Sequence, residues 1–375
     1  MENTPKIDRF FSVPDQMIVV NSSIPYDLYI NSSRVQGREK YIRIFPQNEI
    51  LGEDQLKSFR NKYFQIYVHE DQRNLYLNGI VKLKGVSETE KTRVIKNAAL
   101  EYLDNLFNPS NEITAESLEN TVQSCKEVIS SMVDVIETSG IEDIKEMIGE
   151  LSFHDFYTYD HSINVSMYCI SFLKYLRPQS SRDELILIGL GGLLHDLGKI
   201  GIPTEILNKA TKLSDEEFNK IKAHPHLGHT LLLEKNIQCS GVDMVLLARI
   251  INEHHENFNG TGYPSNLKGE EIHQYARITA ICDFFDAITT KRSYHEAISM
   301  QEAINVMSGT VNKKIDPELF KLFTQSVKIL PQRGKSEVSK TLDESFDPCQ
   351  PHQELDFCEL KKEKEKQQFG KIHIK

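Results

Sequence analysis

A run of helical periodicity from residue 151 to 330 constrains this chain most, because its apolar stretches carry polar side chains in their interior. Its segments are "HSINVSMYCISFLKYL", "RDELILIGLGGLLHDLGK", "SDEEFNKIKAHPHLGHTLLLE", "DMVLLARIINEHHE" and "YARITAICDFFDAITT". Apolar residues at this spacing predict helices that pack on one another. Polar groups on such helices need buried partners. We therefore expect an all-α bundle whose histidines and carboxylates point inward.

The N-terminal part of the chain has a different pattern. The short β-rich runs "QMIVVNSSI", "KYIRIFP" and "YFQIYVHED" alternate with turn signals and with one polar helical stretch, "EDQLKSFRNKY". The expected fold class is thus α+β overall, with a small N-terminal α+β module over residues 1–110 and the all-α bundle over residues 151–330. The module has no metal-ligand cluster and no phosphate-binding loop, so we expect it to be regulatory or sensor-like.

A connecting helix is expected over residues 111–150, where "SLENTVQSCKEVISSMVDVIE" carries an apolar stripe along one face. Two interpretations of the stripe stay open. We favour docking against the protein's own helical core, because a coiled coil normally sustains more heptads. The alternative is a homodimer through the 115–137 helix. Residues 331–375 turn charged, with "KKEKEK" near the end, and we expect a disordered tail there.

Composition excludes several classes of partner. The net charge of -10 argues against general binding of nucleic acid by a basic face. No apolar run approaches the ~20 residues of a membrane helix, and "MENTPKIDRFF" lacks the apolar core of a signal peptide. The 6 cysteines are scattered without a C-x-x-C pair, which indicates reduced thiols. We expect a cytoplasmic protein that binds neither nucleic acid nor membrane.

The stretch "HDLGK" places three polar residues together in an apolar context. If the stretch is helical, His195 and Asp196 are neighbours and Lys199 follows one turn later, so that all three project toward one region. Taken alone, this pattern is more typical of a capped, salt-bridged helix end than of a metal site.

Further histidines and an aspartate recur along the same helices, each in an apolar setting, at His161, His224, His254, His255 and Asp283. Five histidines and two carboxylates are suitable ligands for divalent iron, manganese or zinc. With Asp196 as a bridge, two metal ions fit naturally. Two ions close together suit hydrolysis of a phosphodiester.

Four segments, "HDLGKIGIP", "HPHLG", "HHENFNGTGYP" and "DFFDAITTKRSYHEA", resemble in order and spacing the HD-GYP branch of the HD-domain metal-dependent phosphohydrolases. The resemblance covers about half the chain, residues 151–330. It implies an HD-type helical bundle that hydrolyses the bacterial second messenger cyclic di-GMP to pGpG and, in many members, onward to GMP. It also implies contacts of the GYP loop with partner proteins that contain GGDEF domains.

The resemblance assigns a role to each matching residue. One metal ion, iron or manganese before zinc, would be held by His161, His195, Asp196 and Asp283. The second would be held by His224, His254 and His255 together with the bridging Asp196. Lys199 would contact the scissile phosphate, Arg292 would contact phosphate oxygens, and Tyr263 would reach the substrate from the "NGTGYP" loop. Asp196 and Lys199 are the predicted catalytic residues.

Three positions depart from the family pattern. Tyr157 stands where members with a third metal have glutamate, so we expect two metals. Asn259 replaces the usual aspartate of the loop but still serves a turn. His295 stands where many members carry arginine or lysine, which predicts weaker or pH-dependent contact with substrate phosphate. Asp286 either orients a ligand histidine or forms a helix cap or salt bridge.

Two other functions stay open at this stage. The first is a catalytically weak receptor that binds metals and a cyclic dinucleotide without efficient turnover, which Tyr157 and His295 keep in consideration. The second is an HD phosphohydrolase of another nucleotide. Four histidines have no motif support and are expected to be surface or hydrogen-bonded residues: His154, His226, His229 and His273.

Overall fold

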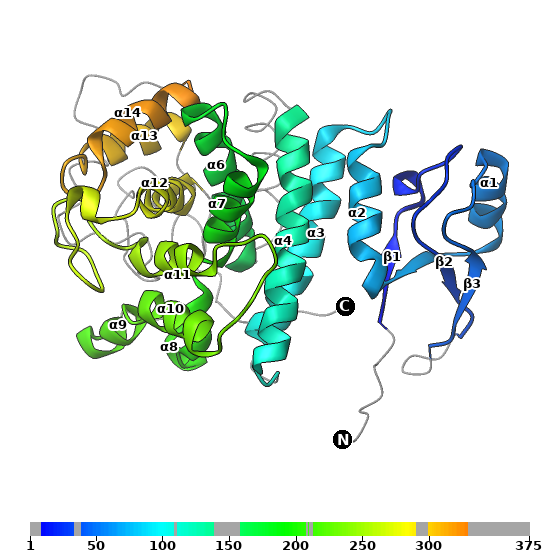
Figure 1. Cartoon of the computed structure of the whole chain (residues 1–375), viewed down its shortest axis with the longest axis horizontal. Helices are drawn as coiled ribbons and strands as arrows, with labels where there is room; N and C mark the ends of the chain where they lie inside the picture. The colour runs from blue at the N-terminus through cyan, green and yellow to red at the C-terminus, as the bar shows by residue number, and fades with distance from the viewer. Residues whose placement is uncertain are drawn as a thin grey trace, which may run out of the picture. The chain divides into compact units, whose positions relative to one another are not determined.

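The computed structural model describes residues 9–33, 39–108, 111–138, 158–207, 209, 213–289 and 299–328. The chain divides into two compact units, and the division passes through helices α3 and α4 (Figure 1). The first unit comprises Met1–Ala99 with Ser130–Ser139, and the second comprises Leu100–Ile129 with Gly140–Lys375. The predicted fold class is confirmed, since a small sheet near the N-terminus is followed by a helical bundle. The domain boundaries given above stay predictions.

The first unit holds a four-stranded antiparallel sheet in the order β1-β4-β2-β3. Phe11 pairs with Val68 and Val13 pairs with Ile66, and all four side chains are buried, so these strands present one apolar face to the core. The elements of this unit are β1 Phe10–Val13, β2 Leu28–Asn31, β3 Tyr41–Phe45, α1 Glu53–Lys62, β4 Ile66–His69, α2 Arg73–Val81 and the first part of α3 Glu88–Phe107.

Sequence patterns predicted this unit only in part. The runs "KYIRIFP" and "YFQIYVHED" contain β3 and β4, and the polar stretch is α1. The prediction of a strand in "QMIVVNSSI" is wrong, because these residues form the end of a short 3-10 helix and then irregular chain. Asn21 adopts a φ of 58°, in the left-handed region, which interrupts an extended strand.

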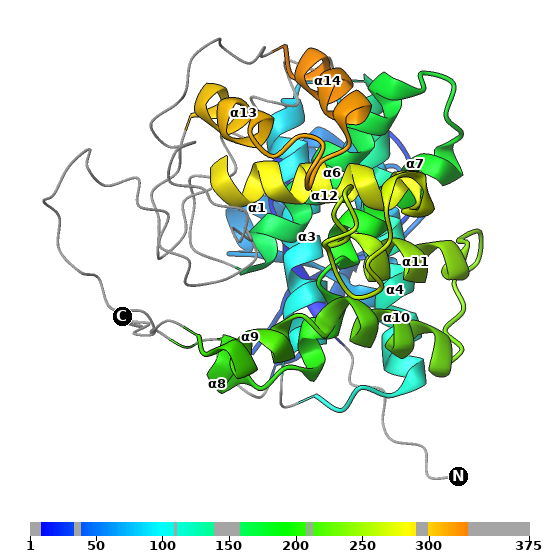
Figure 2. The same cartoon turned by 90° about the vertical axis from the view of Figure 1, so that its left-hand side faces the viewer.

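The second unit is the predicted helical bundle. Helices α7 and α12 contact each other and both contact α6 and α11, and α10 packs on α11 (Figures 1 and 2). Its elements are α6 Thr158–Leu176, α7 Arg182–Leu194, η3 Leu197–Gly201, α8 Thr204–Leu207, α9 Asp215–Ile221, α10 His224–Glu234, α11 Met244–Glu253, η4 Gly269–Glu271, α12 Gln274–Thr289, α13 Met300–Ser308 and α14 Pro317–Ser326. Among the described residues, no helix has both the length and the hydropathy that spanning a membrane requires.

Helix α7 is the buried helix of the bundle. Every residue from 185 to 194 is buried, as expected for a helix that is apolar on all faces. Ser181 begins the helix with a capping box, in which its Oγ accepts from the Glu184 N–H and the Glu184 carboxylate accepts from the Ser181 N–H. The α-helix ends at Leu194, so His195 follows directly after the buried helix and is itself buried.

Two predicted helices break beside the site. "HDLGK" is not α-helical as predicted, because α7 ends at Leu194 and the chain continues as the 3-10 helix η3. The stretch 214–234 divides into α9 and α10. Pro225 has no N–H to donate to the Ile221 carbonyl, which instead lies 2.8 Å from Nδ1 of His224. Both breaks therefore lie beside a histidine of the predicted site, His195 directly after α7 and His224 at the start of α10.

Helix α4, Ala115–Thr138, lies within the predicted connecting helix. Its stripe residues Leu118, Val122 and Ile129 are buried, and a Cβ on Gly189 of α7 would lie 2.7 Å from Ile129 Cγ2. This contact agrees with docking on the protein's own helical core, while a homodimer through the 115–137 helix stays a prediction. Residues 111–114 of the predicted connecting helix are not helical, and residues 139–150 and the predicted 331–375 tail lie outside the described residues.

Gly198 permits the close approach of η3 to α10. A Cβ on this residue would lie 1.9 Å from the His224 carbonyl oxygen and 2.5 Å from the Gly228 nitrogen, and neither backbone can give way cheaply. The approach matters because η3 and α10 carry Lys199 and His224, two of the predicted site residues.

We predict that Gly198→Ala lowers the free energy of unfolding by about 3 kcal/mol or more, since the added methyl group overlaps main chain. Gly201→Ala, in the same 3-10 helix, is the matched control, because a Cβ there meets only the side chain of Leu227, whose Cδ1 lies at 3.2 Å. Urea titration of both variants measures the difference. Equal stability of the two variants would contradict the assigned role of Gly198.

Candidate metal centre

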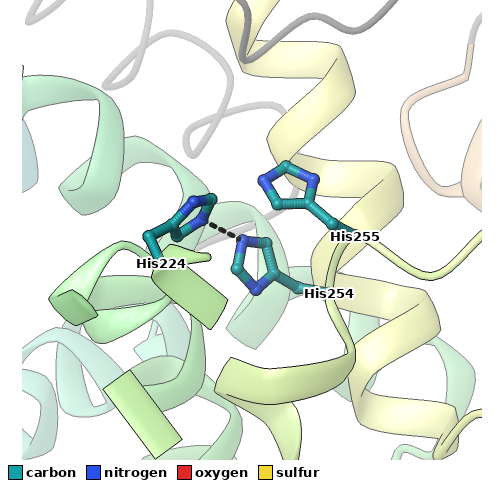
Figure 3. A group of neighbouring side chains, drawn as sticks. All are labelled: His224, His254 and His255. Carbon is teal, nitrogen blue, oxygen red and sulfur yellow. Dashed lines mark hydrogen bonds between the residues drawn. The ribbon is translucent and has the colours of Figure 1, made fainter. Parts of the chain in front are cut away.

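Two groups of candidate ligands come together inside the bundle. His161 on α6 lies with His195 and Asp196 after α7, and ligand atoms of these three residues lie within 4.8 Å of one another. His224, at the start of α10, forms the second group with His254 and His255, which follow α11, under the same limit (Figure 3). Residues far apart in the sequence are thus brought together in the folded chain.

The Asp196 carboxylate connects the two groups. Its Oδ2 lies 3.3 Å from Nε2 of His195, and its Oδ1 lies 3.3 Å from Nε2 of His224. The His195 ring is also 5.2 Å from the His254 ring, centroid to centroid. A single carboxylate therefore has one oxygen toward each group.

Three histidines are oriented by the carbonyl group of the residue three positions earlier in the chain. Nδ1 of His195 is 2.8 Å from the Gly192 carbonyl oxygen, and Nδ1 of His254 is 2.7 Å from the Ile251 carbonyl oxygen. Nδ1 of His224 lies 2.8 Å from the Ile221 carbonyl oxygen in the same way. A carbonyl oxygen only accepts, so each Nδ1 must carry a proton and donate it. In the neutral ring, the lone pair is then on Nε2, which points into the cluster.

Two further aspartates reach the cluster from α12. Oδ1 of Asp283 lies 2.9 Å from Nε2 of His161, and Oδ2 of Asp286 lies 2.7 Å from Nδ1 of the same ring. Both carboxylates are almost fully buried. His161 is thus fixed from both sides, with Asp283 facing the cluster and Asp286 behind the ring.

Charge balance keeps the aspartates of the cluster ionised. Burial by itself would raise the pKa of Asp196, but the Lys199 ammonium and the His195 ring hold that pKa well below its usual range. Burial likewise opposes ionisation of Asp283, whose pKa is nevertheless lowered by its hydrogen bond from His161. Burial would also lower the pKa of His195, yet Asp196 outweighs this and raises it to about 9.

In the second group, the pKa values of all three histidines are lowered, in contrast to that of His195. Burial lowers the pKa of His224 to about 3 and, together with His195, that of His254 to about 4. Burial also lowers the pKa of His255 well below its ordinary value. These rings are neutral at pH 7, the form in which imidazole binds a metal ion.

The cluster has the donor atoms that a divalent metal centre requires. Nε2 of His195, Oδ1 of Asp196 and Nε2 of His255 are buried and make no hydrogen bond within the described residues. A buried polar atom without a hydrogen bond costs about 1–3 kcal/mol, and a metal ion, which would displace the proton of His195 Nε2, would remove that cost. Nitrogen and carboxylate donors fit iron, manganese or zinc, so the residues present fit the predicted cofactor.

Lys199 and Tyr263 lie at the edge of this cluster. Nζ of Lys199 is 2.6 Å from Oδ2 of Asp196, and the Tyr263 ring is 4.9 Å from the His255 ring. The sequence analysis did not single out Glu256, whose buried carboxylate accepts from the N–H groups of Ser265 and Leu267 and so holds the loop that carries Tyr263. Its position directly after the histidine pair was the only signal in the sequence.

Four positions named in the sequence analysis lie outside the described residues, namely His154, Tyr157, Arg292 and His295. The histidines without motif support stay apart from the two ligand groups where they are described. His226 and His229 stack on each other with ring centroids 6.3 Å apart, and Nδ1 of His273 accepts from the Tyr275 N–H.

Comparison with known proteins identifies the domain. The family model described as HD domain matches residues 156–319, which include both ligand groups. Residues 156–319 therefore match the HD-domain family model, and the chain is similar to HD-GYP proteins. The predicted resemblance is therefore confirmed.

Curated relatives of the HD domain are named as phosphodiesterases. "Cyclic di-GMP phosphodiesterase PA4108" of Pseudomonas aeruginosa is 38% identical over 206 residues, which are 54% of this chain and 47% of that protein. "3'3'-cGAMP-specific phosphodiesterase 3" of Vibrio cholerae is 32% identical over 175 residues, 47% of this chain and 36% of that protein. The chain thus spans less than half the length of these two relatives.

A solved structure shares the fold. It is that of Bd1817, described as an HDG"Y"P protein from Bdellovibrio bacteriovorus, and it matches with a TM-score of 0.51 at 19% identity. The match covers 85% of this chain and 100% of the other. At this identity the likeness supports the fold of the HD domain and nothing about its chemistry.

Removing metal ions should reveal a pH dependence that the buried histidines impose on stability. His224 and His254 have pKa values of about 3 and 4 when folded and about 6.5 when unfolded, so below pH 6.5 the unfolded chain binds protons that the folded chain does not. Their contribution is complete above pH 6.5 and declines as pH falls. His195, whose pKa is raised to about 9, acts in the opposite direction. Its stabilising contribution is complete below pH 6.5 and is lost as pH rises toward 9, so it offsets part of the decline between pH 7 and pH 5.

In chelator-treated protein we therefore predict that the free energy of unfolding falls between pH 7 and pH 5. His224 and His254 should each account for on the order of 1 kcal/mol of this fall, because the unfolded chain takes up a proton at each that the folded chain does not. Urea titrations at each pH measure it. His224→Gln should give a smaller decline. A His224→Gln profile parallel to that of the unsubstituted protein would contradict the assigned pKa.

Asp286→Asn tests the contact behind His161. Loss of the carboxylate weakens the orientation of the ring, and we predict a roughly 10-fold to 100-fold lower affinity for metal. Competition with a chromogenic chelator measures the affinity. Asp183→Asn, which removes an exposed carboxylate at the start of α7, should leave it unchanged. An Asp286→Asn affinity equal to that control would show that Asp286 has only a structural role.

Proposed function

We propose that this chain hydrolyses cyclic di-GMP, giving pGpG, GMP or both, with two divalent metal ions. The observation that carries the proposal is the position of Asp196, with one oxygen 3.3 Å from His195 and the other 3.3 Å from His224. The names of relatives support the substrate, since phosphodiesterases of cyclic di-GMP from Pseudomonas aeruginosa and Xanthomonas campestris are each 38% identical in the matching region.

This geometry supports the ligand sets that we propose. One metal ion is held by His161, His195, Asp196 and Asp283, and the other by His224, His254, His255 and Asp196. Iron or manganese is proposed ahead of zinc, in keeping with the mixture of nitrogen and carboxylate donors. Two such ions supply Lewis acidity for in-line displacement at phosphorus.

The protein's own side chains bind and orient the substrate. Lys199 provides positive charge at Asp196, where it attracts a phosphate to a chain of net charge -10. Tyr263 contacts the substrate from beside His255. Arg292 and His295 contact phosphate oxygens from the segment that follows α12. GGDEF-domain proteins are proposed partners of the GYP loop.

A mixed cyclic dinucleotide is the second candidate substrate. Two Vibrio cholerae relatives, 32% and 31% identical in the matching region, are named 3'3'-cGAMP-specific phosphodiesterases. The metal centre described above acts on a phosphodiester and does not itself distinguish adenine from guanine.

The test is to load the protein anaerobically with iron or manganese and to add cyclic di-GMP and 3'3'-cGAMP in separate reactions. We predict pGpG or GMP from cyclic di-GMP. Asp196→Ala should lower the rate by about 1,000-fold or more, since it removes a ligand of both metals. Chromatography of the products measures the rate.

Asp183→Ala is the matched control and should keep the unsubstituted rate, because its carboxylate is exposed and outside the ligand groups. Hydrolysis of 3'3'-cGAMP alone would select the second candidate. Recovery of both nucleotides intact from protein that contains two metals would contradict the hydrolase proposal. Tight retention of the intact messenger would then indicate a receptor.

A further inference from the structure

Lys222 lies between helix α9 and the loop that carries Tyr263. Its Nζ is 4.6 Å from the centroid of the Phe218 ring, one turn earlier on α9, and 5.7 Å from the centroid of the Tyr263 ring. Both distances are within the range of cation–π attraction. Two elements that are separate in the sequence thus hold one ammonium group in place.

This ammonium group is close to the metal centre. The Tyr263 ring lies 4.9 Å from the His255 ring, which lies 5.0 Å from the His224 ring. Lys222 also precedes His224 by two residues, in the short link between α9 and α10. The ammonium group is therefore separated from the nearest ligand group by a single aromatic ring.

The charge of Lys222 is not balanced by a carboxylate. Within the described part of the chain, no Asp or Glu oxygen lies within 4.0 Å of its Nζ, whereas Lys199 and Lys209 each have one at 2.6 Å. Lys222 is also partly exposed. An oriented, accessible cation beside an aromatic ring is suited to bind a phosphate of an incoming ligand.

We propose that Lys222 is a substrate-binding residue that contacts the phosphate of a cyclic dinucleotide not held by Lys199. This inference rests on the proposed function, because it assigns the two phosphates of that substrate to two lysines. Lys199 binds the phosphate at the metal centre, beside Asp196. Lys222 binds the other, and the Tyr263 ring separates the two positions.

A purely structural role makes a different prediction. Lys222 caps the end of α9, where a cation stabilises the last carbonyl groups, and its contact with Tyr263 could serve only to hold the loop. In that case its removal would impair every phosphodiester substrate alike. A role in binding a second phosphate affects only substrates that have two.

The experiment compares Lys222→Met with Lys220→Met in the metal-loaded, full-length protein. Lys220 is an exposed lysine on the same helix, so the two variants change the net charge equally. Cyclic di-GMP is the substrate with two phosphates, and bis(4-nitrophenyl) phosphate is the probe with one. For Lys222→Met we expect KM for cyclic di-GMP to rise about 10-fold, as for loss of one charge-assisted hydrogen bond, with kcat within about 2-fold.

The controls separate binding from folding. Lys222→Met should leave hydrolysis of bis(4-nitrophenyl) phosphate unchanged and should reduce the dependence of the cyclic di-GMP KM on salt concentration. Lys222→Arg should restore KM to within about 3-fold, because it keeps the charge. Lys220→Met should behave as the unsubstituted protein does.

Two results overturn the inference while the proposed function stands. The first is an unchanged KM for cyclic di-GMP in Lys222→Met, and the second is an equal loss on both substrates, which marks a structural role. Failure of the unsubstituted protein to cleave any cyclic dinucleotide overturns the proposed function, and the assignment of Lys222 to a second phosphate falls with it.

Discussion

The buried carboxylate of Asp196 is the constraint on which the second unit depends. A carboxylate in this position is stable only when positive or hydrogen-bonding groups surround it, and His195, His224 and Lys199 meet it at distances of 3.3, 3.3 and 2.6 Å. These groups come from three segments of chain. The end of α7, the 3-10 helix η3 and the start of α10 must therefore all converge on a single side chain.

The same convergence explains why the α-helices are interrupted beside the site. Gly198 lets η3 pass within contact of the α10 main chain, and Pro225 frees the Ile221 carbonyl to accept from the His224 ring. Each feature interrupts the regular α-helix, but it also places an imidazole with its Nε2 toward the Asp196 carboxylate. The irregularities beside the site are thus the means by which a helical bundle orients polar ligands in its interior.

The candidate site was more predictable from the sequence than the path of the backbone through it. The apolar setting of His161, His224 and Asp283 was sufficient to indicate that they need partners, since burial of such groups is costly in any fold. The end of α7 at Leu194 was not predictable, because "LLHDLGK" keeps helical spacing while tertiary contact of Gly198 with α10 decides the conformation. Lys222 was missed for the same reason, since Tyr263 approaches it only in the folded chain.

The central claim is that Asp196 joins two metal-binding groups into one dinuclear centre. Elemental analysis of protein purified anaerobically with iron or manganese tests it most directly, with His224→Gln/His254→Gln compared with the unsubstituted chain. Our account predicts two metal ions per chain in the unsubstituted protein and one in the double variant, which keeps His161, His195, Asp196 and Asp283. One ion or none in the unsubstituted protein, or loss of both in the double variant with its fold intact, would contradict it.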